Sequence, residues 1–161
     1  RYGYRGRAAP VFIQSFEVAN LKAIRAKSDL PLIQLMDGEG GPADDGKTSY
    51  AAMATIEGLK AIATYADGIG PNKAMVIPRG AIGTLGEPTS LVQDAHAAGL
   101  KVHPWTFRRE NYFLPLGDKG GINPAGHGDL AAEIEVFLKT GIDGLFSDNP
   151  REAVATVKGK P

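Results

Sequence analysis

Residues 100–110, Leu-Lys-Val-His-Pro-Trp-Thr-Phe-Arg-Arg-Glu, decide the fold, because an apolar strand pattern there runs directly into aromatic and charged side chains. A buried strand that ends in such groups, instead of in a tight turn, usually presents its tip to a ligand. Residues 11–17 end alike in Gln-Ser-Phe-Glu, and residues 144–150 end in Ser-Asp-Asn-Pro. Several parallel strands with polar tips at one end predict a (β/α) barrel whose site lies at that end.

Strand and helix signals alternate along the whole chain, which predicts an α/β fold with a parallel sheet covered by helices. The expected strands are residues 11–16, 32–36, 101–107 and 145–147, with one further short strand at either 66–70 or 74–77. Apolar residues at helical spacing predict helices over roughly 18–24, 49–66, 91–97, 130–138 and 153–157. Thr89 or Ser90 is the expected cap of the third helix, and Asp129 that of the fourth.

Three long connections interrupt this alternation, at residues 38–48, 79–88 and 108–128. The first and third directly follow the carboxyl ends of strands, the edge at which parallel α/β folds place their ligands. A connection of about twenty residues without structure of its own is unusual and is typical of a lid or a binding loop. We therefore expect residues 108–128 to serve as one of these.

Side-chain alternation along the strands predicts which residues point into the barrel. A helix-covered outer face should be aliphatic, so the faces that carry Gln14, Gln34 and His103 are expected to point inward. Buried Gln and His side chains need hydrogen-bond partners. A polar network inside the sheet follows, near the tip where Phe16 and Trp105 emerge.

Length and composition set the limits of these expectations. The 161 residues fit one ordinary domain but fall short of the roughly 250 that a complete barrel needs. Eighteen basic and eighteen acidic residues leave no overall field that would recruit nucleic acid or a membrane surface. No apolar run approaches the ~20 residues of a membrane span, and no signal peptide is recognised. The chain starts without Met, which suggests processing or truncation, and it has no Cys, which suits a periplasmic protein but also many cytosolic ones.

One motif match needs separate judgement. The run Gly41-Pro-Ala-Asp-Asp-Gly-Lys-Thr fits G-x-x-x-x-G-K-[ST], the loop that cradles nucleotide phosphates between a strand and a helix. That loop works by pointing backbone N–H groups at phosphate oxygens, yet Pro42 has no N–H. Asp44 and Asp45 would also place two negative charges where the phosphates must sit. A solvated Gly-rich loop is therefore the favoured interpretation, with a nucleotide-binding loop from Gly41 to Thr48 as the alternative.

The three His residues have different expected roles. His96 lies on a predicted helix and is interpreted as a surface or packing residue. His127 lies in a loop near a helix start, where a loop role is favoured over a catalytic one. His103 lies in a strand and is interpreted as a hydrogen-bonded histidine of the barrel. No two of them have metal-ligand spacing, and no carboxylate cluster joins them.

Five further residues at strand tips are candidates for a binding site. Arg108 and Arg109 are suited to bidentate contact with phosphate or carboxylate, or they form surface ion pairs with nearby acidic residues such as Glu110 or Asp118. Trp105 and Phe16 stand at strand ends beside polar groups, which favours pocket walls over caps of the core. Asp148 is either an active-site carboxylate or the cap of the last helix; the Asp-Asn-Pro run favours the cap.

Several segments together resemble the glycerophosphodiester phosphodiesterases, in particular the larger periplasmic or secreted bacterial type. The resemblance covers essentially the whole chain, because five blocks agree with the family in content and order. The blocks are Arg1-Tyr-Gly-Tyr with Val11-Phe-Ile-Gln-Ser-Phe-Glu, Glu57-Gly-Leu-Lys through Tyr65-Ala-Asp-Gly-Ile-Gly-Pro, Leu91-Val-Gln-Asp-Ala, Val102-His-Pro-Trp-Thr-Phe-Arg, and Gly141-Ile-Asp-Gly-Leu-Phe-Ser-Asp-Asn-Pro.

The resemblance implies a (β/α)8 barrel of the PLC-like phosphodiesterase type, of which residues 1–161 look like the C-terminal half. The family hydrolyses glycerophosphodiesters to an alcohol and sn-glycerol 3-phosphate with a metal-assisted pair of His residues. Those His residues and the ligands of the divalent cation, often Ca²⁺, lie in the family's N-terminal half and have no counterpart here. The positions that match the family's substrate pocket are Phe16 and Trp105, with Ser15 and Arg108 nearby.

The implied partners are a small glycerophosphodiester and the N-terminal half of the same barrel, or another chain that supplies it, which leaves a homodimer possible. Neither nucleic acid nor a membrane span is expected, and the implied location is periplasmic or secreted. The alternative from another class is a catalytically empty barrel that binds a phosphodiester without cleaving it.

Overall fold

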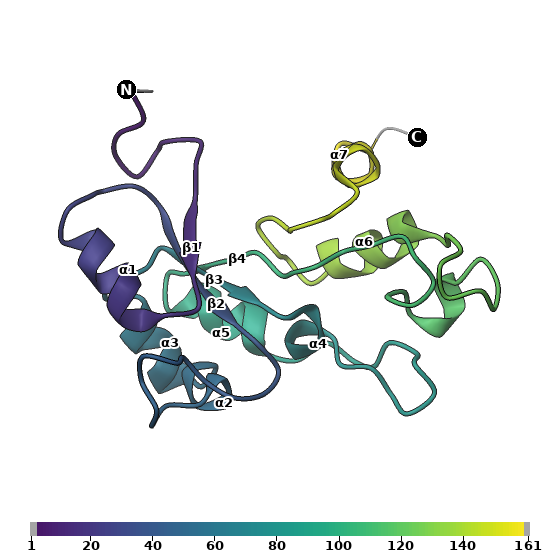
Figure 1. Ribbon diagram of the computed structural model, residues 1–161, viewed down its shortest axis with the longest axis horizontal. Helices are drawn as coiled ribbons and strands as arrows, with labels where there is room; N and C mark the ends of the chain where they lie inside the picture. The colour runs from purple at the N-terminus through teal and green to yellow at the C-terminus, as the bar shows by residue number, and fades with distance from the viewer. Residues whose placement is uncertain (1–2, 160–161) are drawn as a thin grey trace.

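The computed structural model describes residues 3–159 and consists of a parallel sheet with helices packed around it (Figure 1). Strands β1 (Ile13–Ser15), β2 (Leu32–Met36), β3 (Gly68–Pro71) and β4 (Lys101–Val102) form one sheet in the order β1-β2-β3-β4. All three neighbouring pairs are parallel. The α/β class and the parallel sheet predicted from the sequence are therefore confirmed. Arg1 and Tyr2, which begin the first resembling block, lie outside the described residues.

Seven helices connect or follow these strands in the described part of the chain, together with the short 3-10 helix η1 (Leu116–Asp118). They are α1 (Val18–Arg25), α2 (Tyr50–Met53), α3 (Ile56–Ile62), α4 (Lys73–Val76), α5 (Leu91–Ala97), α6 (Leu130–Leu138) and α7 (Pro150–Val157). In Figure 1, α1, α3 and α5 gather around the sheet, whereas α6 and α7 stand apart from it beyond the long segment that follows β4. The longest of them, α6, has nine residues, so no helix among residues 3–159 could span a bilayer.

The two faces of the sheet differ in what covers them. Leu32, Met36 and Ile69 belong to a continuous buried core with apolar residues of α1, α3, α5 and α6. On the opposite face, the register places Gln14 beside Ile33 and Ile33 beside Gly68. This second face carries the predicted inward-pointing side chains of β1 and of the segment after β4.

Gln34 is an exception to the predicted faces, and its assignment to the inward side was wrong. It is fully buried and lies on the same face as Leu32 and Met36, against the helices. Its amide nitrogen donates to the carbonyls of Phe16 (2.8 Å) and Leu35 (3.0 Å), and its oxygen accepts from the Tyr65 hydroxyl at 2.9 Å. A polar side chain can therefore sit in the helix-covered layer when local donors and acceptors satisfy it. Burial raises the pKa of Tyr65 to about 12, so this phenol stays protonated as the donor.

The helix expected over residues 49–66 is two helices, α2 and α3, separated at Thr55. The Thr55 hydroxyl donates to the Ala52 carbonyl (2.8 Å) and accepts from the Gly58 N–H (3.1 Å), so one side chain ends α2 and caps α3. A Cβ at Gly58 would lie 2.3 Å from the Ala52 oxygen, which shows how closely the two short helices approach. Apolar residues continue at helical spacing across this break, so the sequence pattern did not reveal it.

Strand boundaries also differ from expectation. Of the two doubtful strands, the first is β3, whereas the second is α4, which begins after the Asn72 side chain accepts from the Ala74 N–H. The strand expected over 101–107 is regular only in β4, although the N–H groups of His103 and Trp105 still donate to the Ile69 and Pro71 carbonyls. The last expected strand is reduced to a parallel bridge between Phe107 and Ser147.

Helix ends follow the sequence signals more closely. Asp129 caps α6 by accepting from the Ala132 N–H at 2.9 Å, as predicted. Ser90 occupies the cap position of α5 without a side-chain bond to the helix backbone, while the Thr89 hydroxyl accepts from the Leu91 N–H at 3.4 Å. Gly141, at φ 88°, takes up the left-handed conformation just beyond α6.

The carboxylate of Asp143 ties the segment after α6 to β4 and α5. One oxygen accepts from the Val102 N–H and lies 2.9 Å from the His96 Nε2. Partial burial by itself raises the pKa of Asp143, but the hydrogen bonds from His96 and Val102 outweigh it and hold this pKa below its ordinary value. Its ionised form is therefore favoured by folding, which stabilises the protein above the unfolded-state pKa of about 3.9.

We expect Asp143→Asn to lower the free energy of unfolding by about 1 kcal/mol at pH 7, through the loss of a charge-assisted acceptor. The wild type should lose this advantage as the pH falls below about 4, because the carboxylate becomes protonated there. Urea unfolding at pH 7, 5, 4 and 3 measures both effects. Asp29→Asn, at an exposed position, is the control and should leave the curves unchanged; a constant difference between wild type and Asp143→Asn down to pH 3 would contradict the assignment.

Candidate functional site

The candidate site is a hollow of about 390 Å³ at the carboxyl ends of the strands. Phe16 directly follows β1 and Trp105 lies three residues beyond β4; their rings meet edge to face, with centroids 5.8 Å apart and planes at 87°. The structure thus brings together the two aromatic residues that the sequence proposed as pocket walls. The hollow is lined by Gln14, Phe16, Leu35, Trp105, Thr106, Phe146, Ser147 and Asp148.

Contacts between the first and fourth strands show that the sheet is curled around this hollow. Neighbouring strands lie about 4.8 Å apart, so a flat sheet would separate β1 from β4 by roughly 14 Å. Phe16 nevertheless contacts Trp105, and Phe12, just before β1, contacts His103 with ring centroids 4.8 Å apart. The face opposite the helices is therefore concave.

Trp105 is held in one orientation by β3. Its indole Nε1 donates to the Gly70 carbonyl at 2.7 Å, and its backbone N–H donates to Pro71 at 3.1 Å. A Cβ at Gly70 would lie 2.6 Å from Leu35 Cδ2 and 3.2 Å from Ile33 Cγ2. The absence of a side chain at position 70 therefore makes room for Leu35, another wall of the hollow.

The other two predicted pocket residues, Ser15 and Arg108, are not among those that line the hollow. The Ser15 hydroxyl accepts from the Glu17 N–H (3.0 Å) and the Asn20 amide (3.1 Å), at the start of α1. Arg108 lies outside the hollow, beside one of its lining residues. Its Nε donates to Asp148 at 2.5 Å, and its guanidinium stands 4.5 Å from the Phe113 ring centroid. It reaches the hollow only through Asp148.

The ion pairs of the two arginines differ from those considered in the sequence. Arg108 pairs with Asp148 and Arg109 with Glu152 at 2.8 Å, because the start of α7 lies beside them. Asp148 is therefore not the cap of α7, and that interpretation was wrong. The cap position is Asn149, which makes no side-chain bond to its own helix but accepts from the Arg109 N–H at 3.0 Å.

His103 is buried against aromatic rings. It is in contact with Phe12 and lies 6.3 Å, centroid to centroid, from Phe146. Among residues 3–159 its ring makes no hydrogen bond, so the predicted hydrogen-bonded histidine is instead a packed one. Burial lowers the pKa of His103, an effect that Asp143 opposes and Lys101 reinforces. The other two histidines lie elsewhere: His96 pairs with Asp143, and His127 forms a backbone bridge with Glu110.

The Gly-rich loop at residues 41–48 provides a hydrogen-bond acceptor, whereas a phosphate-binding loop provides backbone N–H donors. The Asp44 carboxylate accepts from the Val18 N–H (3.2 Å) and the Ala19 N–H (2.5 Å), and its own N–H donates to Glu17 at 2.8 Å. The loop thus supplies negative charge to the N-terminus of α1 instead of offering N–H groups to an anion. Its Lys47 side chain is exposed.

The long segment 108–128 is ordered around Asn111, a residue that the sequence analysis did not single out. Asn111 is buried; its amide donates to the Asn123 carbonyl at 2.8 Å, and its oxygen accepts from the Gly120 N–H at 2.9 Å. Its backbone N–H adds a bond to Gly126 at 2.7 Å. The only available signal was an Asn between the charged Glu110 and the aromatic pair Tyr112-Phe113, which does not by itself reveal this role.

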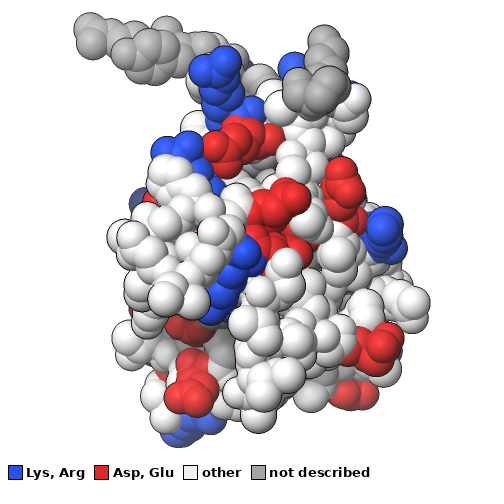
Figure 2. Space-filling view, turned by 90° about the vertical axis from the view of Figure 1, so that its right-hand side faces the viewer, with Lys and Arg blue, Asp and Glu red and all other residues white. Residues whose placement is uncertain are grey.

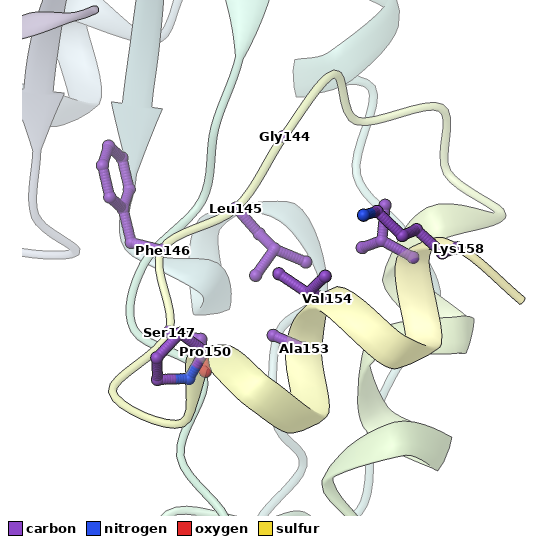
Figure 3. Close-up of a pocket in the computed structure, with 9 residues that line it drawn as sticks. Gly144, Leu145, Phe146, Ser147, Pro150, Ala153, Val154 and Lys158 are labelled. Carbon is purple, nitrogen blue, oxygen red and sulfur yellow. The ribbon is translucent and has the colours of Figure 1, made fainter. Parts of the chain in front are cut away.

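A second, more apolar groove of about 430 Å³ lies between residues 144–147 and α7. In Figure 3, Leu145 and Val154 point toward one another across it, whereas Phe146 turns away. Val154 and Val157 are half exposed there.

Charges of both signs are mixed on the surface of the molecule. On the face in Figure 2, basic and acidic side chains stand next to one another, consistent with the balanced composition. Within residues 3–159 no three His, Asp or Glu side chains gather closely enough to hold a metal ion.

The fold and the hollow define a parallel α/β protein with an aromatic-walled site at the carboxyl ends of its strands. The model of the glycerophosphoryl diester phosphodiesterase family matches residues 1–152, and the chain belongs to this family. The sequence prediction of the family is thereby confirmed.

Two curated relatives carry the same family name. Over 156 residues the chain is 36% identical to glycerophosphodiester phosphodiesterase GDPD6 of Arabidopsis thaliana, covering 92% of this chain and 40% of that protein. It is 26% identical over 179 residues to a glycerophosphodiester phosphodiesterase of Haemophilus influenzae, covering 99% and 45%.

Two crystal structures named for the same activity share the fold. One from Silicibacter pomeroyi has a TM-score of 0.57 at 23% identity and covers 92% of this chain and 38% of its own. The other, from Agrobacterium tumefaciens, has a TM-score of 0.53 at 16% identity and covers 91% and 43%. The chain thus spans less than half the length of each of these four proteins.

Gly70→Ala tests the close packing behind the hollow. We expect it to lower the free energy of unfolding by about 1–3 kcal/mol, because the new methyl group overlaps Leu35 and Ile33. Urea unfolding measures the change, and Trp105 fluorescence reports any displacement of the indole. Gly46→Ala, where an added Cβ meets nothing within 4 Å, is the matched control and should be neutral; equal effects of the two variants would disprove the packing argument.

Proposed function

We propose that this chain supplies the substrate-pocket part of an enzyme that hydrolyses glycerophosphodiesters to an alcohol and sn-glycerol 3-phosphate. The observation that carries the proposal is the edge-to-face contact of Phe16 and Trp105 at the mouth of the concave sheet, in a member of this family. An apolar wall fits the carbon skeleton of a glycerol unit, and the polar side chain of Gln14 stands beside it for the hydroxyls.

In this proposal the residues of the chain bind and orient the substrate. The indole of Trp105 is fixed by Gly70, so little rotamer freedom is lost when a ligand packs against it. Alignment of this kind lowers a reaction barrier by several kcal/mol when it holds the reacting atoms in place. Arg108 offsets the charge of Asp148, which otherwise would repel an anionic phosphodiester from the hollow.

The acid and base chemistry is assigned to the remainder of the barrel. We propose a pair of His residues and a divalent cation, Ca²⁺ in the first instance, held outside residues 1–161, as the resemblance to the family implies. The cation would neutralise phosphate charge. No step of the reaction is assigned to it through residues of this chain. A periplasmic or secreted location belongs to the same proposal.

The remaining strands are proposed to come from an N-terminal half or from another chain. Within the described residues, β1 and the segment 145–147 are unpaired on their outer sides. Phe12 near one edge and Val154 and Val157 near the other are about half exposed, and the groove of Figure 3 runs along the second edge. Unpaired strands and apolar side chains at both edges favour a partner that closes the sheet.

The experiment is an assay of the protein that contains this chain, with glycerophosphocholine and glycerophosphoethanolamine as substrates. We expect release of glycerol 3-phosphate that stops after a chelator is added and returns with Ca²⁺. A folded protein that binds these diesters without releasing glycerol 3-phosphate would instead be a binding protein, and the proposal would be wrong.

Trp105→Ala is expected to raise KM for glycerol-headed diesters about tenfold, because an aromatic wall worth about 1.4 kcal/mol of contact is lost. Hydrolysis of bis(p-nitrophenyl) phosphate, which has no glycerol unit, and the affinity for Ca²⁺ should change little. Ile82→Ala removes an exposed apolar side chain outside the hollow and is the control. Equal losses for both substrates together with loss of the cation would rule out a pocket-wall role.

The Arg108–Asp148 pair gives a prediction about charge. Arg108→Gln should raise KM for an anionic diester about three- to tenfold, because Asp148 is left uncompensated beside the hollow. Adding Asp148→Asn to that variant should restore most of the loss, and added salt should reduce the difference between them. If the double variant is as impaired as Arg108→Gln, Arg108 acts in some other way.

A further inference from the structure

A fully buried carboxylate, that of Glu133, lies in α6, outside the hollow. Glu133 has no exposed surface, and its Oε1 accepts from the Lys73 Nζ at 2.7 Å and from the Arg79 Nη2 at 3.1 Å. Acidic residues are rarely buried completely unless they are paired. Glu133 therefore holds two cations, one from the start of α4 and one from the connection that follows it.

Both cations also bind the same backbone oxygen. Lys73 donates to the Phe113 carbonyl at 3.3 Å, and Arg79 donates to it as well. Burial holds the pKa of Lys73 below its ordinary value, and the Glu133 carboxylate offsets this only in part. The long segment 108–128 is thereby fastened at Phe113 to α4 and α6.

The ring of Phe113 packs against the guanidinium of Arg108. The guanidinium lies 4.5 Å from the centre of the Phe113 ring, within the range of a cation–π contact, and donates to Asp148 at 2.5 Å. Asp148 lines the hollow. A continuous series of contacts therefore leads from a buried carboxylate in α6 to a charged group at the site.

We propose that Glu133 is a positioning residue for the pocket: through Lys73 and Arg79 it fixes Phe113, and so holds Arg108 in the position that neutralises Asp148. The inference rests on the proposed function, since it assigns Arg108 a part in binding an anionic diester. Arg has a long side chain with several rotatable bonds, so a fixed aromatic platform reduces the rotamer freedom that binding must remove.

Stability alone is a poor reason for this cluster. The second carboxylate oxygen of Glu133 is buried and has no hydrogen-bond partner among residues 3–159, which costs free energy. Buried ion pairs are often no more stabilising than apolar residues of similar volume. Placement of the Phe113 platform provides a reason for a charge to be retained there.

The test is a double-mutant cycle in the protein that contains this chain, with Glu133→Gln, Arg108→Gln and the two combined. If Glu133 acts through Arg108, each single variant raises KM for glycerophosphoethanolamine three- to tenfold with kcat within twofold, and the double variant is no worse than Arg108→Gln. Effects on KM that multiply, or an unchanged KM in Glu133→Gln, overturn the inference. Arg79→Gln, at a partly exposed residue, takes the place of Glu133→Gln if that variant does not fold, with the same expectations.

A second readout does not depend on activity. Trypsin cleavage after Lys119, exposed within the fastened segment, should be at least threefold faster in Glu133→Gln than in the wild type, because Phe113 is no longer held. Glu152→Gln removes only the exposed pair with Arg109 and is the control, with wild-type cleavage and KM. A wild type that releases no glycerol 3-phosphate disproves the proposed function alone; an unchanged cleavage rate in Glu133→Gln disproves the fastening of Phe113, whatever the activity.

Discussion

The parallel pairing of neighbouring strands throughout the sheet, from β1 through β2 and β3 to β4, is the constraint from which the rest of the molecule follows. It sends every strand in the same direction, so that the segments after β1, β2, β3 and β4 all emerge at one edge. Because the sheet is curled, side chains from its first and fourth strands meet across the concave face. Helices can cover only the outer face, and the inner face is left for Phe16, Trp105 and their neighbours.

The order of strands and helices could be predicted from the sequence because it depends on local periodicity and on caps such as Asp129. Errors arose where one side chain changed the outcome. Thr55 divided a helix whose apolar period was unbroken. Gln34 was placed on the wrong face because two of its partners, the Tyr65 hydroxyl and the Phe16 carbonyl, are long-range contacts that strand alternation does not contain.

The site was partly predictable for the same reason. Phe16 and Trp105 could be selected because both follow apolar strands directly, and the structure brings them together. Arg108 was selected as a charged tip, but its partner Asp148 depends on where α7 begins, which is a tertiary fact. Asn111 and Glu133 escaped notice because their importance comes from burial, and a lone polar residue in an apolar context does not reveal its partners.

The meeting of Phe16 and Trp105 across the sheet has a consequence for how such a pocket can be tuned. The two rings follow different strands, β1 and β4. The distance between them therefore depends on the curvature of the whole sheet and not on either residue alone. A substitution between β2 and β3 that changed the twist of the sheet would widen or narrow the distance between the two rings without contacting either ring. Selectivity for the size of a ligand could then evolve at a distance, through the curvature of the scaffold.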